Sequence, residues 1–251
     1  MEAIIELRDV HKAFGSQKVL KGIDLSLPRD RVNVIIGRSG GGKSVLLKHV
    51  IGLIRPDRGQ VIVDGTDIAA MRDRQLAGVR KKFGMLFQEG ALFDSLSVAE
   101  NVAFPMREHT RLSSREIRER VEAKLTDVGL KGMGYKMPSE LSGGMRKRVG
   151  LARAMALDPE IVLFDEPTSG LDPIMSAAIS DLIVQTRAQF GATCVVISHD
   201  IQATMTTADN IFMLYEGTII AQGTPEEIRN NEDPVVRQFI SGSLQGPIGM
   251  G

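Results

Sequence analysis

The sequence predicts an α/β fold with a parallel-sheet core, an N-terminal antiparallel β subdomain and a helical subdomain. The chain opens with two strand-like segments, residues 5–10 and 19–27, which a polar turn at residues 15–17 separates, as in a β-hairpin. Further on, short apolar runs alternate with helix-like patterns, which is typical of a parallel sheet. The stretch from about residue 91 to residue 157 has helical periodicity instead and predicts the helical lobe. The predicted later strands comprise residues 32–36, 59–63, 161–164, 193–197 and 211–214.

Capping residues mark three helix starts. Ser113 and Glu116 match a capping box, in which each side chain bonds the backbone of the other residue. A second capping box spans residues 224–227. Asp172 and Pro173 place a capping residue directly before a proline, which is the preferred order at a helix start. We therefore expect a helix to begin at each of these points.

The balance of charge argues against a general nucleic-acid binder. The chain has 31 basic and 31 acidic residues, whereas such binders carry a basic surplus. No apolar run approaches the ~20 residues that a membrane-spanning helix requires. The amino terminus also lacks the basic flank of a secretory signal. The single cysteine, Cys194, stands in an apolar run, so we expect a small buried side chain in a reducing compartment, by default the cytoplasm.

A glycine-rich loop follows the strand at residues 32–36 and precedes a helical pattern that Gly52 closes. It fits the phosphate-loop pattern, in which glycines let successive backbone N–H groups converge on polyphosphate oxygens. Lys43 is expected to reach the β- and γ-phosphates, and the Ser44 hydroxyl to bind Mg²⁺. The pattern therefore predicts ATP and Mg²⁺ as cofactors. The loop consists of Gly37, Arg38, Ser39, Gly40, Gly41, Gly42, Lys43 and Ser44.

Two carboxylates follow the apolar run at residues 161–164. Asp165 and Glu166 stand at the end of this predicted strand, where parallel sheets place their ligand sites. Phosphoryl transfer needs a metal ligand and a group that orients the attacking water. We therefore expect Asp165 to hold Mg²⁺ and Glu166 to polarise the water.

The family is indicated by Leu141, Ser142, Gly143, Gly144 and Met145. With this run the chain resembles the ABC ATPases over nearly its whole length, and the expected fold is that of a P-loop NTPase of the ABC type. Two glycines at a helix start form an anion site. The resemblance implies that Ser142, Gly143 and Gly144 contact the nucleotide of the opposite subunit in a head-to-tail dimer. Met145 replaces the family's usual Gln, which we expect to cost little, because Ser142 and the glycine N–H groups are the donors.

Other residues match the family's remaining motifs. Phe14 lies where an aromatic ring usually stacks on adenine, although an ordinary strand residue is the alternative. Gln88 matches the glutamine that senses Mg²⁺ and water, and His199 matches the histidine that contacts the γ-phosphate. Residues 169–172, which end in Asp172, match the loop that links the two subunits. The resemblance implies catalytic roles for Glu166, His199, Gln88 and Lys43, metal binding by Ser44, Gln88 and Asp165, and a nucleotide-site role for Asp172.

Two short basic runs have a simpler interpretation. Residues 80–82 and 146–148 are interrupted by apolar neighbours. We expect them to be solvated faces or, for the second run, part of the helix behind the signature.

More specific stretches look like the ATPases of bacterial lipid-asymmetry transporters, the Mla type with MCE-domain partners. They are residues 84–96, 100–105, 141–145 and 233–240, followed by residues 246–247. The resemblance implies phospholipid transport, or transport of a related hydrophobic molecule, between the inner and outer membranes of a bacterium. It implies as partners a second copy of the chain, a membrane permease, an MCE-domain periplasmic subunit and a small STAS-like cytoplasmic subunit. The location implied is the cytoplasmic face of the inner membrane.

The implied mechanism is closure of two chains on two ATP molecules, followed by hydrolysis and reopening. The segment after Gln88 is the expected socket for a helix of the permease. We expect an ATPase domain at residues 1–240 and a tail at residues 241–251.

Three alternatives stay open. The first is the ATPase of a small-solute importer. The second is a soluble ABC ATPase of translation or DNA repair, although these usually carry paired cassettes or long coiled-coil insertions. The third is a regulatory cassette without activity, which the intact Lys43, Glu166 and His199 argue against.

Overall fold

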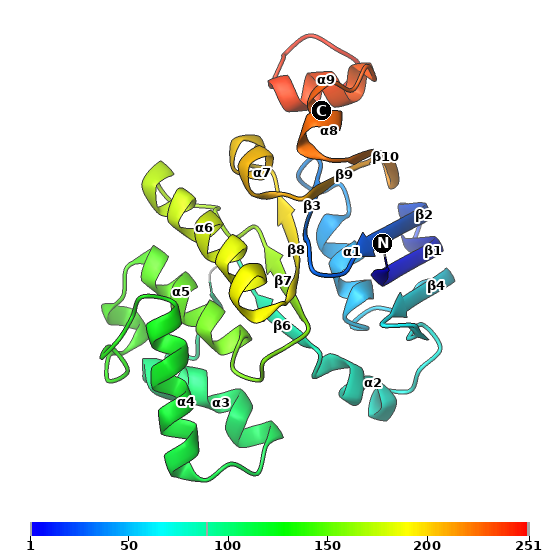
Figure 1. Ribbon diagram of the computed structural model, residues 1–251. Coiled ribbons are helices and arrows are strands. Elements are labelled where there is room, and N and C mark those ends of the chain that lie inside the picture. Colours follow the sequence, from blue (N-terminus) through cyan, green and yellow to red (C-terminus); the bar gives the residue numbers. More distant parts are fainter. Residues whose placement is uncertain (1, 89, 250–251) are drawn as a thin grey trace. The chain divides into compact units, whose positions relative to one another are not determined.

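The computed structural model describes residues 2–88 and 90–249, which form two compact units (Figure 1). The first unit comprises Met1–Arg80 and Val195–Gly251, and the second comprises Lys81–Cys194. Glu89, part of the run at residues 84–96, lies outside the described residues.

The first unit contains the predicted N-terminal antiparallel sheet. Strands β1 (Ala3–Phe14) and β2 (Gln17–Pro28) form a hairpin whose last pair is Phe14 with Gln17. Strand β4 (Arg58–Val63) pairs with the other edge of β1 and with β5 (Thr66–Asp67), so the strand order is β2-β1-β4-β5. The hairpin is confirmed, and the buried residues of β1 are its apolar ones, Ile4, Ile5, Leu7 and Val10.

A parallel strand pair in the first unit leads into the phosphate loop. Strand β3 (Val32–Ile36) pairs parallel with β9 (Asn210–Tyr215), and β9 pairs antiparallel with β10 (Thr218–Gly223). Every residue of β3 is buried, which explains its uninterrupted apolar character. Strand β10 was not predicted, because its half-exposed residues lack such a run.

Five helices in the described part of the first unit connect or flank these strands. Helix α1 (Lys43–Val50) follows the glycine-rich loop. Gly52, two residues after the end of this helix, has a φ of 65°. The capping box predicted at residues 224–227 is present at α8. The others are α2 (Asp73–Arg80), α7 (Ile201–Thr207), α8 (Pro225–Arg229) and α9 (Pro234–Ser241).

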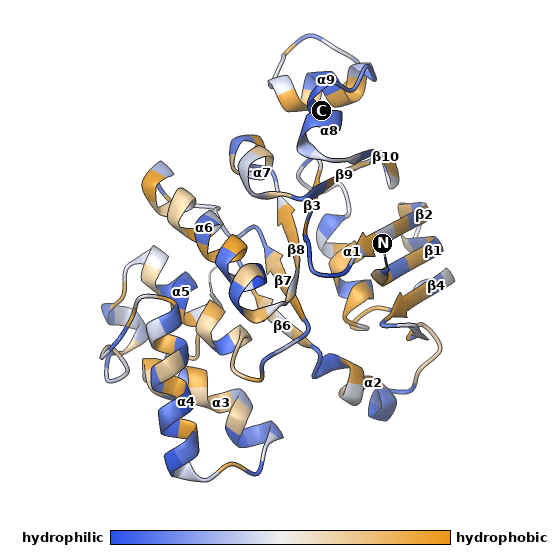
Figure 2. Ribbon diagram, in the orientation of Figure 1, coloured by the Kyte–Doolittle hydropathy of each residue, from blue (hydrophilic) through white to orange (hydrophobic). Residues whose placement is uncertain are grey.

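The second unit contains its own parallel strand pair and one long helix. Strand β6 (Phe83–Leu86) pairs parallel with β7 (Ile161–Asp165). Helix α6 (Pro173–Phe190) begins at the predicted cap, where the Asp172 carboxylate accepts the N–H groups of Ile174 and Met175. Strand β8 (Thr193–Ser198) begins in this unit, and its six residues are all buried, including Cys194. Figure 2 shows the hydrophobic colouring of β7 and β8.

The helical part of the second unit is built from α3, α4 and α5, which pack against one another (Figure 1). Both Ser97 with Glu100 and Ser113 with Glu116 form complete capping boxes at the starts of α3 and α4. The second of these boxes was predicted. The elements are α3 (Val98–His109), α4 (Ser114–Asp127), the 3₁₀ turn Pro138–Glu140 and α5 (Gly143–Ala154). Among the described residues, no helix is both long and apolar enough to cross a membrane.

A buried histidine lies on the helix that follows the phosphate loop. His49 is 1% exposed, and its Nδ1 donates to the Val45 carbonyl at 2.7 Å. Its Nε2 is buried without a hydrogen-bond partner among the described residues. Burial lowers the pKa of His49, Lys12 lowers it further, and Asp57 opposes the shift. His49 is therefore neutral in the folded protein near pH 7.

We predict that His49 makes the folded protein less stable as the pH falls from 7 to 5.5. The unfolded chain binds a proton there that folded His49 excludes, so the free energy of unfolding should fall by up to about 1.4 kcal/mol per pH unit. His49→Leu should lose this contribution, whereas the exposed His109→Leu should keep it. Urea unfolding at several pH values measures the slopes, and equal slopes for the parent and His49→Leu would contradict the prediction.

Candidate functional site

The phosphate loop joins β3 to α1 and has the backbone that anion binding requires. Gly40 and Gly42 have φ values of 73° and 99°, and the Gly41 N–H donates to the Arg38 carbonyl at 3.1 Å. Gly37 has a φ of 151°, and a Cβ there would lie 2.2 Å from the Leu214 carbonyl oxygen. The loop can therefore curl only because these positions lack side chains.

Lys43 begins α1 and turns its ammonium back onto the loop. It is 6% exposed, and its Nζ donates to the carbonyls of Gly37 at 2.8 Å and Arg38 at 3.0 Å. Ser39 and Ser44, both exposed, lie on either side of the loop's last glycines. The ammonium is thus held beside the backbone N–H groups of the loop, which would donate to phosphate oxygens.

Phe14 ends β1 with its ring 48% exposed. The Lys12 ammonium lies over one face of this ring, 5.6 Å from its centroid. Asp57 accepts from Lys12 Nζ and from the Ala13 N–H, both at 2.7 Å, and these bonds lower the pKa of the Asp57 carboxyl. The arrangement stabilises Phe14 by a cation–π contact and leaves ring surface available for stacking.

His199 lies between β8 and α7 and is exposed. Its neighbour Asp200 caps α7 by accepting the Ala203 N–H at 3.0 Å, and the Asp200 N–H donates to Ser198 Oγ at 3.0 Å. These bonds fix the backbone on both sides of the imidazole.

The two acidic residues of the second unit stand at the carboxyl end of β7, as predicted. Asp165 is the last residue of the strand, and Glu166 has a φ of 51°. A residue other than glycine rarely adopts this left-handed conformation. Glu166 begins the turn that leads to α6.

Hydrogen bonds inside this turn, and one from Gln88, hold it in place. The Ser169 N–H donates to the Glu166 carbonyl at 3.2 Å, and the Leu171 N–H donates to the Thr168 carbonyl at 3.2 Å. Gln88 Nε2 donates to Ser169 Oγ at 3.2 Å, a bond that does not involve the Gln88 amide oxygen. Asp172, at the end of the turn, is engaged in capping α6.

The signature run forms the start of α5. Ser142 is the N-cap, and its Oγ accepts the Met145 N–H at 3.3 Å. Met145 therefore takes part in the cap through its backbone N–H. Gly143 and Gly144 occupy the first turn, where their N–H groups have no partner within the helix.

Lys147, one turn further along α5, is a residue whose position the sequence interpretation missed. It is 4% exposed, and its Nζ donates to the carbonyls of Pro167 at 2.7 Å and Ser169 at 2.6 Å. The basic run at residues 146–148 does belong to the helix behind the signature, but its central lysine is buried rather than solvated. Helical spacing could have revealed this, because Gly144, Lys147 and Leu151 share the buried face.

An open hollow of about 560 Å³ brings several of these groups together within the second unit. Gln88, Ser169 and the signature residue Gly143 all line this hollow. Among the described residues its lining includes Gln88, Ala91, Leu92, Asp94, Gly143, Arg146, Lys147, Ser169, Gly170 and Leu171.

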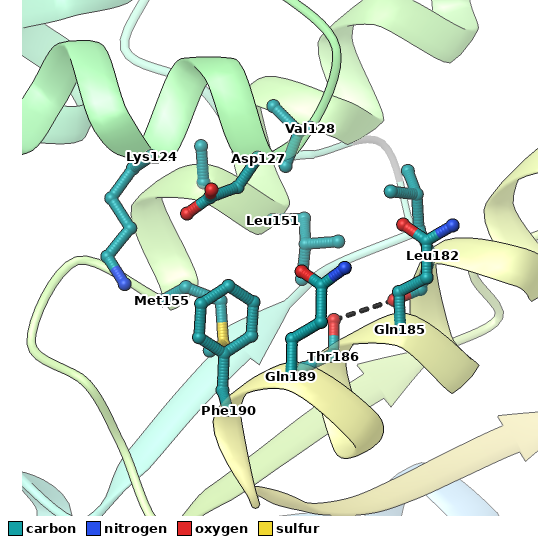
Figure 3. Close-up of a pocket in the computed structure, with 11 residues that line it drawn as sticks. Lys124, Asp127, Val128, Leu151, Met155, Leu182, Gln185, Thr186, Gln189 and Phe190 are labelled. Carbon is teal, nitrogen blue, oxygen red and sulfur yellow. Dashed lines mark hydrogen bonds between the residues drawn. The ribbon is translucent and has the colours of Figure 1, made fainter.

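A second hollow between α4, α5 and α6 is too small to bind a ligand (Figure 3). Its volume of about 10 Å³ would admit a single water at most. Lys124 lies at its edge with Nζ 4.8 Å from the Phe190 ring centroid. Thr186, which also lines it, donates to the Leu182 carbonyl.

The candidate site residues thus fall on both units. The first unit carries Phe14, the phosphate loop with Lys43, and His199, and the second carries Gln88, the acidic pair, the signature glycines and Asp172. Within the second unit the structure brings Gln88, the signature and the turn after Glu166 to one hollow.

The donor set fits Mg²⁺ bound together with nucleotide. Among the described residues no group of three or more His, Cys, Asp or Glu side chains could hold a metal by itself. Mg²⁺ usually takes only one or two protein oxygens and completes its shell with phosphate and water. A serine hydroxyl, an amide oxygen and one carboxylate therefore suffice.

Comparison with known proteins identifies the class. The model of the ABC transporter family matches residues 20–169, so the chain belongs to that family. Members of this class are ATPases, and this chain is an ATP-hydrolysing, nucleotide-binding cassette.

Curated relatives cover nearly the whole chain. The chain is 48% identical to "Probable ribonucleotide transport ATP-binding protein mkl" of Mycobacterium tuberculosis, over 100% of this chain and 70% of that protein. It is 43% identical to "Intermembrane phospholipid transport system ATP-binding protein MlaF" of Escherichia coli, over 98% of this chain and 91% of that protein.

Solved structures share the fold. The chain superposes on the ATP-binding cassette MJ0796, a dimer in a post-hydrolysis state with ADP and Pi, with a TM-score of 0.80 and 31% identity over 88% of this chain and 98% of that chain. It superposes on cbiO1 from Clostridium perfringens, part of the ABC transporter complex cbiONQ, with a TM-score of 0.85 and 30% identity over 95% of each chain. The predicted ABC-type fold is confirmed.

We predict that Phe14→Ala weakens ATP binding by about 1–3 kcal/mol, because a ring face for base stacking is lost. Phe14→Tyr should bind normally, since stacking needs only the ring. Calorimetry with ATP and with tripolyphosphate measures the difference, and the Phe14→Ala loss should be absent with tripolyphosphate. Equal affinity of the parent protein for the two ligands would contradict stacking.

Proposed function

We propose that this chain is the ATPase subunit of a lipid transporter, in which two copies close on ATP and drive a membrane permease. The observation that carries the proposal is the match to the MlaF protein, which extends over 98% of this chain and 91% of that one. The class of activity belongs to the family, whereas the residue roles, the partners and the cargo are proposals.

The proposed chemistry divides the work among the named residues. Bound Mg²⁺ would supply charge neutralisation at the β- and γ-phosphates, with Ser44, Gln88 and Asp165 as the residues that hold it. Lys43 exchanges its carbonyl partners for phosphate oxygens, which are stronger acceptors because they are charged. Glu166 accepts the proton of the attacking water, and His199 donates to the γ-phosphate.

The signature requires a second copy of the chain. Gly143 and Gly144 offer N–H groups at the start of α5, and Ser142 retains a hydroxyl proton to donate. We propose that these donors bind the γ-phosphate held by the phosphate loop of the partner copy, in a head-to-tail dimer. The relative MJ0796 crystallised as a dimer, which supports this arrangement.

A second cargo has an observation in its favour. The mkl relatives, named for probable ribonucleotide transport, have the higher identities of 47% and 48%. Their match covers only 70% to 72% of those proteins, whereas the MlaF match covers both chains almost fully. We therefore favour phospholipid, or a related hydrophobic molecule, over ribonucleotide.

The segment after Gln88 has the properties of a socket for a helix of the permease. Phe93 and Phe104 form a ring pair 4.9 Å apart, yet they are 43% and 39% exposed. Asn101, fully buried, donates to the carbonyls of Phe93, Leu96 and Ser97 and accepts the Phe93 N–H. Exposed aromatic rings on a rigid backbone suit an interface that must transmit force.

The remaining assignments extend the same proposal. An MCE-domain periplasmic subunit and a small STAS-like cytoplasmic subunit would complete the transporter, with this chain peripheral on the cytoplasmic face of the inner membrane. Residues 1–240 would form the ATPase domain, residues 91–157 its helical subdomain, and residues 241–251 a tail.

We predict that Glu166→Gln binds ATP normally but hydrolyses it 10²- to 10⁴-fold more slowly, on the order of what losing a general base costs. With ATP it should accumulate as a dimer, because the closed state no longer reopens. Turnover assays and analytical ultracentrifugation measure the two effects.

The control is Ser142→Arg in the same Glu166→Gln chain. It should bind ATP through the intact phosphate loop but remain a monomer, because a bulky cation occupies the signature. Near-parent turnover by Glu166→Gln would rule out its role as the base, and ATP-induced dimers of the double variant would rule out the shared site.

We predict that the complex co-purified with this chain from membranes contains a permease and transfers labelled phospholipid between vesicles in an ATP-dependent way. The Glu166→Gln complex should not. The same vesicles tested with a labelled ribonucleotide provide the comparison. ATP-dependent ribonucleotide uptake without lipid transfer would overturn the cargo assignment and leave the ATPase assignment intact.

A further inference from the structure

Lys147 is a buried charged group for which the proposed mechanism so far has no use. Three lysines of the described chain are buried, Lys43, Lys124 and Lys147. Lys43 belongs to the phosphate loop, and Lys124 forms an ion pair with Asp158 at 2.6 Å. The hydrogen bonds of Lys147 instead reach the turn that follows Glu166. Burying an ammonium costs several kcal/mol unless hydrogen bonds compensate. The carbonyl oxygens that accept from Lys147 must therefore stay within hydrogen-bonding distance of its Nζ.

Two carbonyl acceptors of Lys147 lie on either side of one residue in that turn. Its Nζ donates to the Pro167 carbonyl at 2.7 Å and to the Ser169 carbonyl at 2.6 Å. The turn is further closed by the Ser169 N–H bond to the Glu166 carbonyl at 3.2 Å. One ammonium therefore holds the first and third residues after the proposed base.

The other end of the Lys147 side chain is anchored in the signature helix. Helix α5 begins at Gly143 with Ser142 as its cap, and Lys147 lies in its second turn. Gln88 reaches the same turn through Ser169 Oγ at 3.2 Å. The backbone after Glu166 is thus bonded both to the signature helix and to Gln88.

We propose that Lys147 is a positioning residue for ATP hydrolysis, holding the backbone after Glu166 against the signature helix so that the carboxylate faces the attacking water. This inference rests on the proposed role of Glu166. A reacting group displaced by about 1 Å can lose on the order of 100-fold in rate. Binding of ATP by the phosphate loop does not depend on the Lys147 bonds, so affinity and rate should separate.

Lys124 provides a matched control for a purely structural role. It is 9% exposed, makes one 2.6 Å bond to Asp158, and contacts the Phe190 ring face (Figure 3). It touches neither the turn after Glu166 nor the signature. Lys→Met at either position removes the ammonium and keeps the length of the side chain, so each variant loses the bonds of one buried lysine and the melting temperature reports the structural cost of that loss.

The test compares Lys147→Met, Lys147→Gln, Lys124→Met, Glu166→Gln and the parent, each as the full chain in its co-purified complex. We expect Lys147→Met to lower kcat about 10- to 100-fold with KM for ATP within about twofold and a parent-like melting temperature. Lys147→Gln, which retains a shorter donor, should have an intermediate kcat. Lys124→Met should keep the parent kcat. Lys147→Met combined with Glu166→Gln should bind ATP as tightly as Glu166→Gln alone.

The outcomes separate this inference from the proposed function. If Glu166→Gln turns over like the parent, the assignment of the base fails, and the positioning role fails with it. If Glu166→Gln is inactive but Lys147→Met keeps the parent kcat, only the positioning role fails. A loss of kcat that Lys124→Met reproduces, or one accompanied by an equal rise in KM or a collapse in melting temperature, would also overturn it.

Discussion

A buried ammonium must find acceptors in place of water, and this requirement shapes both loops that carry the candidate chemistry. Lys43 finds them in the carbonyls of Gly37 and Arg38, and Lys147 finds them in the carbonyls of Pro167 and Ser169. In each case the first or second turn of a helix supplies the lysine, and a loop at the end of a strand supplies the oxygens. The charge therefore orders backbone that would otherwise have no regular partner. The two lysines differ in what can replace these bonds, since only Lys43 is proposed to exchange its acceptors for phosphate.

Local signals in the sequence predicted most of the elements that position the site. Strands β3, β7 and β8 are fully or largely buried and therefore appear as uninterrupted apolar runs. Helix starts could be predicted because a cap involves residues only three positions apart, as in Ser113 with Glu116. The phosphate loop could be predicted for the same reason, because its glycines and Lys43 lie within eight consecutive residues.

What the sequence could not supply depends on contacts between distant segments. Lys147 meets carbonyls 20 and 22 positions further along the chain, and backbone acceptors leave no trace in side-chain identity. Asp57, which supports Phe14 through Lys12 and Ala13, lies 45 and 44 positions from these two residues. The site motifs concern only nucleotide, and the relatives are named for different cargoes.

The left-handed backbone of Glu166 has a consequence for how this protein can evolve. At a φ of 51° glycine would be the relaxed choice, and a glutamate costs of order 1 kcal/mol or more there. Sequence drift towards greater stability should therefore favour glycine or asparagine at this position, and only selection for the proposed role of Glu166 as the base would oppose it. A homologue that is no longer selected for ATP hydrolysis would be expected to lose this glutamate before it loses its fold. The residue at this position would therefore distinguish active homologues from inactive ones.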